Sequence, residues 1–448
     1  MQGHGGMSKR RPNILWIFSD QHRGQALGCA GDVNVRTPNL DRLAAEGVRF
    51  TNAYSNTPIC APFRAGLYTG TTMTTHGVTA LFVPLDPSHR TLHGELRRAG
   101  YTTVHYGKWH LSGGDCPSHF VSPWFRPGWD EWLGWENSNR PWETEYSRGN
   151  LPMPMERLDG YQTDAMTDLS IDWLAGSGEK QPWFHVLSVE PPHPPFTAPE
   201  RNMRRLRGRD IALRPNVPAE DPDVDRHVAD LRAYYAQIEN LDENVGRLLS
   251  ALEESGQLDD TIVCYFSDHG EFLGSHGRRH KSRPEVESSR IPLIVRYPPS
   301  VPAGRVSDAL ICGIDLMPSM LALAGVPIPE SVEGTDASPV MRGERDDVRD
   351  EVVLQFDQSF YGTPRPYETF RSLVTKRWMY SRFIVDGESH LFDLEADPYQ
   401  LDNLIDDPTH AGTVRELDGR LVALLEEIGD PIVETEAWKK PLARKEIR

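Results

Sequence analysis

Apolar runs alternate with amphipathic segments along most of this 448-residue chain, up to about residue 340. Such alternation is typical of strands joined by crossover helices in an α/β fold. The runs that predict strands lie at 13–20, 101–106, 182–196, 261–270 and 292–298. Helical patterns between them lie at 37–47, 91–100 and 227–254. The pattern therefore predicts an α/β fold with a large, central, mostly parallel mixed sheet flanked by helices.

The pattern changes after about residue 345. Short apolar runs at 351–356, 370–375, 377–383 and 390–394 predict further strands, and one helix is expected near 413–427. Consecutive strands without helices between them favour an antiparallel sheet. We therefore expect two domains, a large α/β domain over residues 1–345 and a smaller C-terminal α+β subdomain over 346–448.

The balance of charge argues against several classes of partner. The chain has 65 acidic and 48 basic residues, a net charge of −17 at pH 7. This field repels nucleic acid, so an anionic substrate would need a local basic pocket. No apolar run approaches the ~18 residues that span a bilayer, and no apolar stretch of a signal peptide follows the basic N-terminus. We expect a cytoplasmic protein that binds neither nucleic acid nor membrane, and nothing in the sequence indicates its oligomeric state.

Polar side chains follow four of the predicted strands at the points where the strands end. In chain order they are Asp20 and Gln21, Lys108 and His110, His193, and Asp268 and His269. The ligand crevice of an open α/β sheet lies outside the carboxyl ends of its strands. We therefore expect these side chains to converge in one site.

The expected site combines metal ligands with cations. Asp20, Asp268 and Gln21 offer the hard oxygens that Ca²⁺, Mg²⁺ or Mn²⁺ prefer, and the nitrogen of His269 moves the preference towards Mn²⁺. Positive charge and hydrogen-bond donors come from Arg64, Lys108, Lys281 and His193. A divalent ion beside several cations predicts an anionic substrate, which is a phosphate, phosphonate or sulfate ester.

Cys60 stands apart from the other cysteines. The chain has five cysteines, an odd number without a CxxC pair, which argues against a disulfide scaffold. Cys264 lies in an apolar run typical of a core, whereas Cys60 precedes Pro62 and Arg64 on a turn into a predicted helix. If this turn reaches the crevice, the side chain of Cys60 lies at a helix N-terminus beside the metal, where a nucleophile is activated.

The segment CAPFRAGLYTG at 60–70 resembles the sulfatase signature, in which cysteine or serine is followed by proline two positions on and by arginine four positions on. The likeness extends, in the family's order, through PNILWIFSDQHR, GYTTVHYGKWHL, EPPHPPF, SDHGEFLGSHGRRHKS, RIPLIVRYP and HLFDLEADPYQLDNL. Over nearly its whole length the chain is thus similar to the type I, formylglycine-dependent sulfatases of the alkaline phosphatase superfamily. The resemblance implies the fold of that superfamily and a sulfuric ester hydrolase.

The resemblance also implies roles for the matched residues. Cys60 would be oxidised by a formylglycine-generating maturation enzyme, and the hydrated aldehyde would be the nucleophile. The implied metal ligands are Asp20, residue 60, Asp268 and His269, with Gln21 adjacent or ligating. Arg64 would orient the diol, and Lys108 and Lys281 would hold the sulfate oxygens. His193 would bind the sulfate or protonate the leaving oxygen, and His110 would take the proton whose loss regenerates the aldehyde.

Three features depart from the family's usual pattern. The pairs Asp20–Gln21 and Asp268–His269 resemble the branch with choline sulfatases and phosphonate monoester hydrolases, which leaves the metal open between Ca²⁺ and Mn²⁺, with Mg²⁺ also compatible. Phe63 replaces the usual serine or alanine, although the three positions thought to be read by the maturation enzyme are intact. The catalytic lysine is aligned with Lys281, and His280 is its competitor.

Two alternatives to sulfate ester hydrolysis stay open. The first is a phosphonate monoester or phosphodiester hydrolase, but Lys108 and His110, which resemble the sulfatase pattern, favour sulfate. The second is a non-catalytic anion-binding homologue, although every catalytic position is filled.

The expected substrate is a small sulfate monoester, which is a sulfated sugar or an aryl or alkyl sulfate. Of the tryptophans between 124 and 142, Trp129 and Trp132 are expected in the core. Trp135, Asn137 and Trp142 are candidates for substrate contact.

Overall fold

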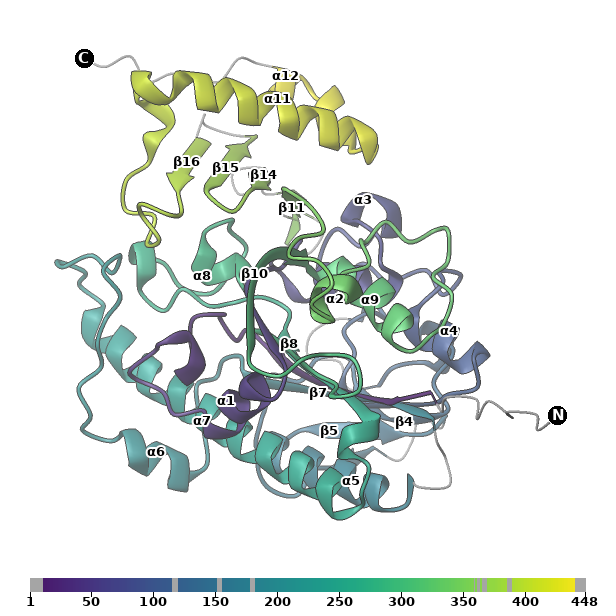
Figure 1. Cartoon of the computed structure of the whole chain (residues 1–448). Helices are drawn as coiled ribbons and strands as arrows, with labels where there is room; N and C mark the ends of the chain where they lie inside the picture. The colour runs from purple at the N-terminus through teal and green to yellow at the C-terminus, as the bar shows by residue number, and fades with distance from the viewer. Residues whose placement is uncertain are drawn as a thin grey trace.

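The computed structural model describes residues 11–114, 120–150, 155–177, 182–357, 359–360, 363–364, 369–384 and 389–439. Within these segments ten strands form one sheet in the order β10–β2–β9–β8–β1–β7–β3–β4–β5–β6 (Figure 1). The strands are β1 (Asn13–Asp20), β2 (Val48–Tyr54), β3 (Thr102–Lys108), β4 (Glu131–Trp135), β5 (Glu145–Arg148), β6 (Glu156–Arg157), β7 (Trp183–Pro192), β8 (Thr261–Ser267), β9 (Leu293–Arg296) and β10 (Arg305–Cys312).

The centre of this sheet is parallel and its flanks are mixed. β1 pairs in parallel with β7 and β8, and β3 pairs in parallel with β7 and β4. β9 runs antiparallel to both β8 and β2, and β5 runs antiparallel to β4. The prediction of a mostly parallel mixed sheet is therefore confirmed.

Helices cover both faces of the large sheet, which is why β1 is apolar along nearly its whole length. Ile14, Trp16 and Phe18 point to the face covered by α2 (Cys60–Thr69), α4 (Leu92–Arg98) and α9 (Leu316–Leu323). Leu15 and Ile17 point to the opposite face, under α1 (Pro38–Ala45), α5 (Gln162–Ala175) and α7 (Val224–Glu254). The period-2 alternation of a strand thus supplies two apolar layers, one on each face.

The C-terminal part is built on a second sheet. Its strands β11 (Val352–Phe356), β14 (Phe370–Val374), β15 (Trp378–Phe383) and β16 (Ser389–Asp393) are antiparallel in this order. α11 (Ala411–Glu427) packs on one face of it, and the other face packs against residues of the large sheet that include Tyr54 and Leu310. The predicted antiparallel sheet is confirmed, whereas the boundary at 345/346 stays a prediction.

The remaining elements are short. They are α3 (Met73–His76), α6 (Glu200–Leu206), α8 (Val286–Ser289), α10 (Ser338–Met341), α12 (Glu436–Lys439), β12 (Ser359–Phe360) and β13 (Thr363–Pro364). Among the helices of the described segments, none combines the length and the apolar character needed to cross a membrane.

Candidate active site

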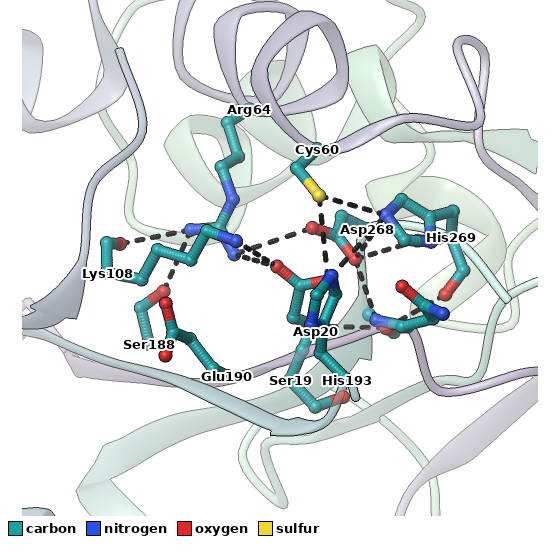
Figure 2. A network of polar contacts seen from close by, with 12 residues as sticks. Ser19, Asp20, Cys60, Arg64, Lys108, Ser188, Glu190, His193, Asp268 and His269 are labelled. Carbon is teal, nitrogen blue, oxygen red and sulfur yellow. Dashed lines mark hydrogen bonds and ion pairs between the residues drawn. The ribbon is translucent and has the colours of Figure 1, made fainter. Parts of the chain in front are cut away.

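Four strands and one helix bring the predicted site residues together (Figure 2). Asp20 ends β1 and Lys108 ends β3, while His193 and Asp268 directly follow β7 and β8. Cys60 is the first residue of α2, so its side chain lies at the N-terminus of a ten-residue helix. The convergence expected from the ends of parallel strands is therefore present in the structure.

Four potential metal ligands form a compact, buried cluster. One ligand atom from each of Asp20, Cys60, Asp268 and His269 lies within 4.8 Å of the others. The sulfur of Cys60 is 3.6 Å from Asp20 Oδ1 and 3.2 Å from His269 Nε2. His269 Nε2 is in turn 3.5 Å from Asp268 Oδ1. Two carboxylates, an imidazole and a sulfur thus face one another without exposure to solvent.

Arg64 and Lys108 lie on one side of this cluster. The guanidinium of Arg64 is 3.3 Å from Asp20 and 3.4 Å from Asp268, and it also donates to the hydroxyl of Ser188 at 2.9 Å. Lys108 Nζ donates to Asp20 Oδ2 at 2.7 Å. Both cations are buried, so their orientation is fixed by the carboxylates they pair with.

Lys281 approaches the cluster from the loop after β8. Its Nζ is 3.5 Å from the sulfur of Cys60 and donates to Gln21 Oε1 at 2.5 Å. The side-chain amide of Gln21 also donates to Glu271, a buried carboxylate that accepts the backbone N–H of His280 at 2.6 Å. Gln21 therefore connects Lys281 with Glu271.

The pKa values of the two aspartates in the site are shifted in opposite directions. Burial alone would raise the pKa of Asp20, but the charges of Lys108 and Lys281 hold it well below its usual value. Burial and the neighbouring charge of Asp20 raise the pKa of Asp268. Burial and the charge of Asp20 also raise the pKa of the Cys60 thiol to about 11.

Three site histidines are held in the neutral form. Burial lowers the pKa of His110, His193 and His269 well below the usual value, and nearby lysines add to the effect. His193 Nδ1 contacts the carbonyl oxygen of Pro194 at 2.6 Å. His110 has a left-handed backbone with φ of 60°, and its two buried ring nitrogens make no hydrogen bond within the described residues. A neutral imidazole without a partner can accept a proton from a bound ligand.

The donor set fits a divalent cation. Arg64 pairs with the Oδ2 atoms of Asp20 and Asp268, and Lys108 pairs with Oδ2 of Asp20. The Oδ1 atoms of the two carboxylates face the neutral imidazole nitrogen of His269, at 3.6 and 3.5 Å, where a cation would bind between them. Oxygen and nitrogen ligands of this kind suit Ca²⁺ or Mn²⁺.

The structure places the two competing basic residues differently. Lys281 contacts Cys60 and Gln21, whereas the side chain of His280 is 58% exposed, with Nδ1 3.8 Å from Glu271. The arrangement favours Lys281 as the residue that faces the cluster.

One candidate for substrate contact needs correction. Trp135 is fully buried in the core beneath the large sheet, and its Nε1 donates to Glu190 at 3.2 Å. Because β4 continues through Trp135, strand alternation turns this side chain into the same core layer as Leu133. Asn137 is also buried, whereas Trp142 is 44% exposed and packs on the ring of Tyr161, with 4.9 Å between centroids.

Sequence reasoning missed several supporting residues. They are Ser188, which holds Arg64, the buried carboxylates Glu136 and Glu190, and Glu271. An acidic residue at the end of a buried strand, directly before Pro191 and Pro192, was the available signal for Glu190. The contacts of Glu136 and Glu271 depend on loops that no periodicity describes.

Comparisons with known families and sequences agree along the chain. A family model described as sulfatase matches residues 12–326, and a model of the C-terminal part of N-sulphoglucosamine sulphohydrolase matches residues 274–427. An ulvan-active sulfatase from Formosa agariphila is 35% identical over 426 residues, which cover 94% of this chain and 82% of the relative.

Solved structures show the same similarity. A candidate sulfatase from Bacteroides fragilis superposes with a TM-score of 0.89 at 28% identity, covering 96% of this chain and 99% of the other. A structure bound to its substrate D-glucosamine-2-N,6-O-disulfate superposes with a TM-score of 0.83 at 25% identity, covering 96% of this chain and all of the other.

Proposed function

The chain belongs to the sulfatase family and is a sulfuric ester hydrolase, and from this premise we propose that it hydrolyses a sulfate monoester of a sugar through a formylglycine made from Cys60. The observation that carries the proposal is the place of Cys60. Its side chain lies at the start of α2, buried between the metal-ligating cluster and Lys281. A hydrated aldehyde at this position supplies a hydroxyl nucleophile next to the metal-ligating cluster.

We infer that Asp20, residue 60, Asp268 and His269 hold one divalent ion, Ca²⁺ or Mn²⁺. When bound, such an ion polarises a sulfate oxygen as a Lewis acid. The compact, buried donor cluster supports this assignment. Gln21 lies beside this set, and its side-chain oxygen is occupied by Lys281.

Side chains of the protein bind the sulfate, orient residue 60 and transfer the protons. Lys108 and Lys281 bind the sulfate oxygens, and Arg64 orients residue 60, because all three bring positive charge to the same buried space. His193 binds the sulfate or, once protonated, protonates the leaving alcohol oxygen, because it directly follows β7 and lies beside Asp20 in the site (Figure 2). His110, held neutral by burial, accepts the proton whose removal frees the inorganic sulfate.

A sulfated sugar is the substrate class best supported by the relatives. One relative is active on ulvan, and one neighbouring structure holds a disulfated glucosamine. The exposed ring of Trp142 offers an apolar face of the kind on which sugar rings stack. Phosphonate ester hydrolysis is the alternative that the experiment below separates from sulfate ester hydrolysis.

The experiment measures the mass of the peptide that contains Cys60, from protein produced together with a formylglycine-generating enzyme. We expect the mass of an aldehyde in place of the thiol, together with release of inorganic sulfate from sulfated monosaccharides and from 4-nitrophenyl sulfate. A Cys60→Ala variant is the matched control, and it should retain the fold and lose hydrolysis.

The two readouts separate the parts of the proposal. An intact thiol in an active preparation would contradict the formylglycine nucleophile. A modified protein that releases phosphonic acid from a phosphonate monoester faster than sulfate from any sulfate ester would contradict the substrate class.

A further inference from the structure

We propose that Glu190 and Glu136 are positioning residues that hold His110 in place through the turn at 136–139. The inference rests on the role proposed above for His110. It concerns two buried carboxylates that lie outside the metal-ligating cluster and contact neither Cys60 nor the other ligands in the described hydrogen bonds. Figure 2 shows Glu190 beside Ser188 and Lys108, at the edge of the site.

Glu190 uses both carboxylate oxygens to hold the segment that follows β4. Oε1 accepts Trp135 Nε1 at 3.2 Å and the backbone N–H of Ser138 at 2.7 Å. Oε2 accepts the backbone N–H of Asn139 and the side-chain amide of Gln162, each at 3.0 Å. Four donors thus converge on one side chain that is only 2% exposed. Charge-assisted hydrogen bonds of this kind are stronger than those between neutral groups.

The segment that Glu190 holds also forms hydrogen bonds with the loop that carries His110. The backbone N–H of Trp109 donates to the carbonyl of Trp135 at 2.8 Å. Glu136 Oε1 accepts the backbone N–H groups of Ser112 at 2.8 Å and Gly113 at 3.2 Å. His110 therefore lies between one hydrogen bond from Trp109 to Trp135 on its N-terminal side and two hydrogen bonds to Glu136 on its C-terminal side.

These backbone bonds matter because the ring of His110 has no anchor of its own. Both ring nitrogens are buried and make no hydrogen bond within the described residues. The left-handed backbone of His110, with φ of 60°, is also a conformation that a non-glycine residue adopts only when its surroundings hold it. The orientation of the imidazole therefore depends on its backbone, which the turn fixes.

Glu136 and Glu190 should respond differently to replacement by glutamine. Glu136 accepts both backbone N–H groups with the same oxygen, Oε1, so a glutamine can retain these bonds. Glu190 divides four donors between two oxygens, so a glutamine there turns an NH₂ group towards two other donors. The geometry thus distinguishes Glu136→Gln, which should be tolerated, from Glu136→Ala and Glu190→Gln, which should not.

The experiment measures kcat and KM for 4-nitrophenyl sulfate in the formylglycine-containing enzyme. Misplacing a reacting group by about 1 Å can lower a rate by roughly 100-fold. We therefore expect Glu190→Gln and Glu136→Ala to lower kcat by roughly 10- to 100-fold, with KM falling alongside and kcat/KM little changed, because His110 acts on the release of sulfate from residue 60 and not on substrate binding or the first step. Glu136→Gln should retain most of the activity. If the negative charge of Glu136 were what the enzyme requires, this variant would lose activity as well.

Asp242→Asn provides the control for a general loss of stability. Asp242 is also a buried carboxylate that accepts two consecutive backbone N–H groups, those of Asn39 and Leu40, but it joins α7 to α1. It should lose stability without a fall in kcat. Equal effects on kcat from Asp242→Asn and Glu190→Gln would overturn the proposal, as would a Glu190→Gln variant with wild-type kcat.

Amide hydrogen exchange tests the hold on His110 without any assay of activity. In Glu190→Gln we expect faster exchange in peptides covering 109–114 and 136–142, and unchanged exchange there would overturn the proposal. A His110→Ala variant is measured alongside. If that variant retains kcat, the role proposed for His110 fails, and the exchange data still decide whether the glutamates hold its loop.

Discussion

Lys281 and His280 are adjacent in the chain, but their side chains lie in different environments. Lys281 Nζ is 3.5 Å from the sulfur of Cys60, whereas the His280 side chain is 58% exposed. Lys281 lies between two residues with left-handed backbones, with φ of 68° at His280 and 78° at Ser282. The backbone of this loop thus directs Lys281 towards the cluster and His280 towards solvent.

This difference leads to a prediction for alanine variants of the two residues. Removal of a donor aimed at developing negative charge costs about 100- to 1,000-fold in kcat, so Lys281→Ala should lower kcat/KM for sulfate esters by at least roughly 100-fold. His280→Ala should stay close to the wild type. Steady-state kinetics on the formylglycine-containing protein checks both, and a larger loss in His280→Ala would show that the lysine is wrongly assigned.

Single residues show where sequence reasoning about the site succeeds and where it stops. Asp20 and Asp268 could be placed because they directly follow strong apolar runs, and the ends of parallel strands meet at one edge. Trp135 was wrongly placed because its surroundings are set by Glu190, which lies 55 residues away in the chain. Contacts of this separation leave no periodic trace in the sequence.

The packing of α2 against η6 (Gly313–Asp315) fixes the start of the helix that carries Cys60. Phe63 is fully buried on α2, and its ring occupies the space beside Gly313. A Cβ at residue 313 would lie 2.3 Å from Phe63 Cε2. The aromatic ring on α2 and the missing side chain on η6 are therefore complementary.

This complementarity predicts coupling between two substitutions. Gly313→Ala should destabilise the protein by about 1–3 kcal/mol through overpacking, and Phe63→Ala by about 3–5 kcal/mol through a cavity. The double variant should be more stable than the sum of these losses by roughly 1 kcal/mol or more, because the new methyl group enters the space left by the ring. Urea unfolding of the four proteins measures the coupling, and strictly additive losses would contradict it.

The helices and strands themselves were largely predictable, because each depends on local periodicity. The helix expected at 227–254 is α7 (Val224–Glu254), and the helix expected near 413–427 is α11 (Ala411–Glu427). The order of strands was not predictable, since β1 lies between β7 and β8, which are distant in sequence. Apolar strands buried on both faces do not specify their neighbours, and tertiary packing decides the order.

The large α/β part and the C-terminal part of the chain are joined by buried polar contacts between loops and α8 as well as by apolar packing. Glu287, on α8, accepts Arg214 Nε at 2.9 Å and Asn216 Nδ2 at 2.8 Å. The same amide of Asn216 donates to the carbonyl of Tyr399, in the C-terminal part of the chain, at 3.0 Å. Although burial alone would raise the pKa of Glu287, its contacts with His276 and Arg214 lower it to about 2. The folded protein therefore favours the ionised carboxylate.

This lowered pKa predicts how the stability of the whole molecule depends on pH. An unfolded glutamate titrates near pH ~4.3, so the contribution of Glu287 is complete above that pH and is lost as the pH falls towards 2. Each pKa unit corresponds to about 1.4 kcal/mol. Glu287→Gln should therefore be less stable than the wild type at pH 7 by a few kcal/mol, and its stability should fall less steeply between pH 5 and pH ~2.

Urea unfolding at a series of pH values measures both effects. Glu200→Gln, which alters an exposed ion pair with Arg207, is the control and should change neither. Parallel stability curves for Glu287→Gln and the wild type would show that this carboxylate does not couple the fold to pH.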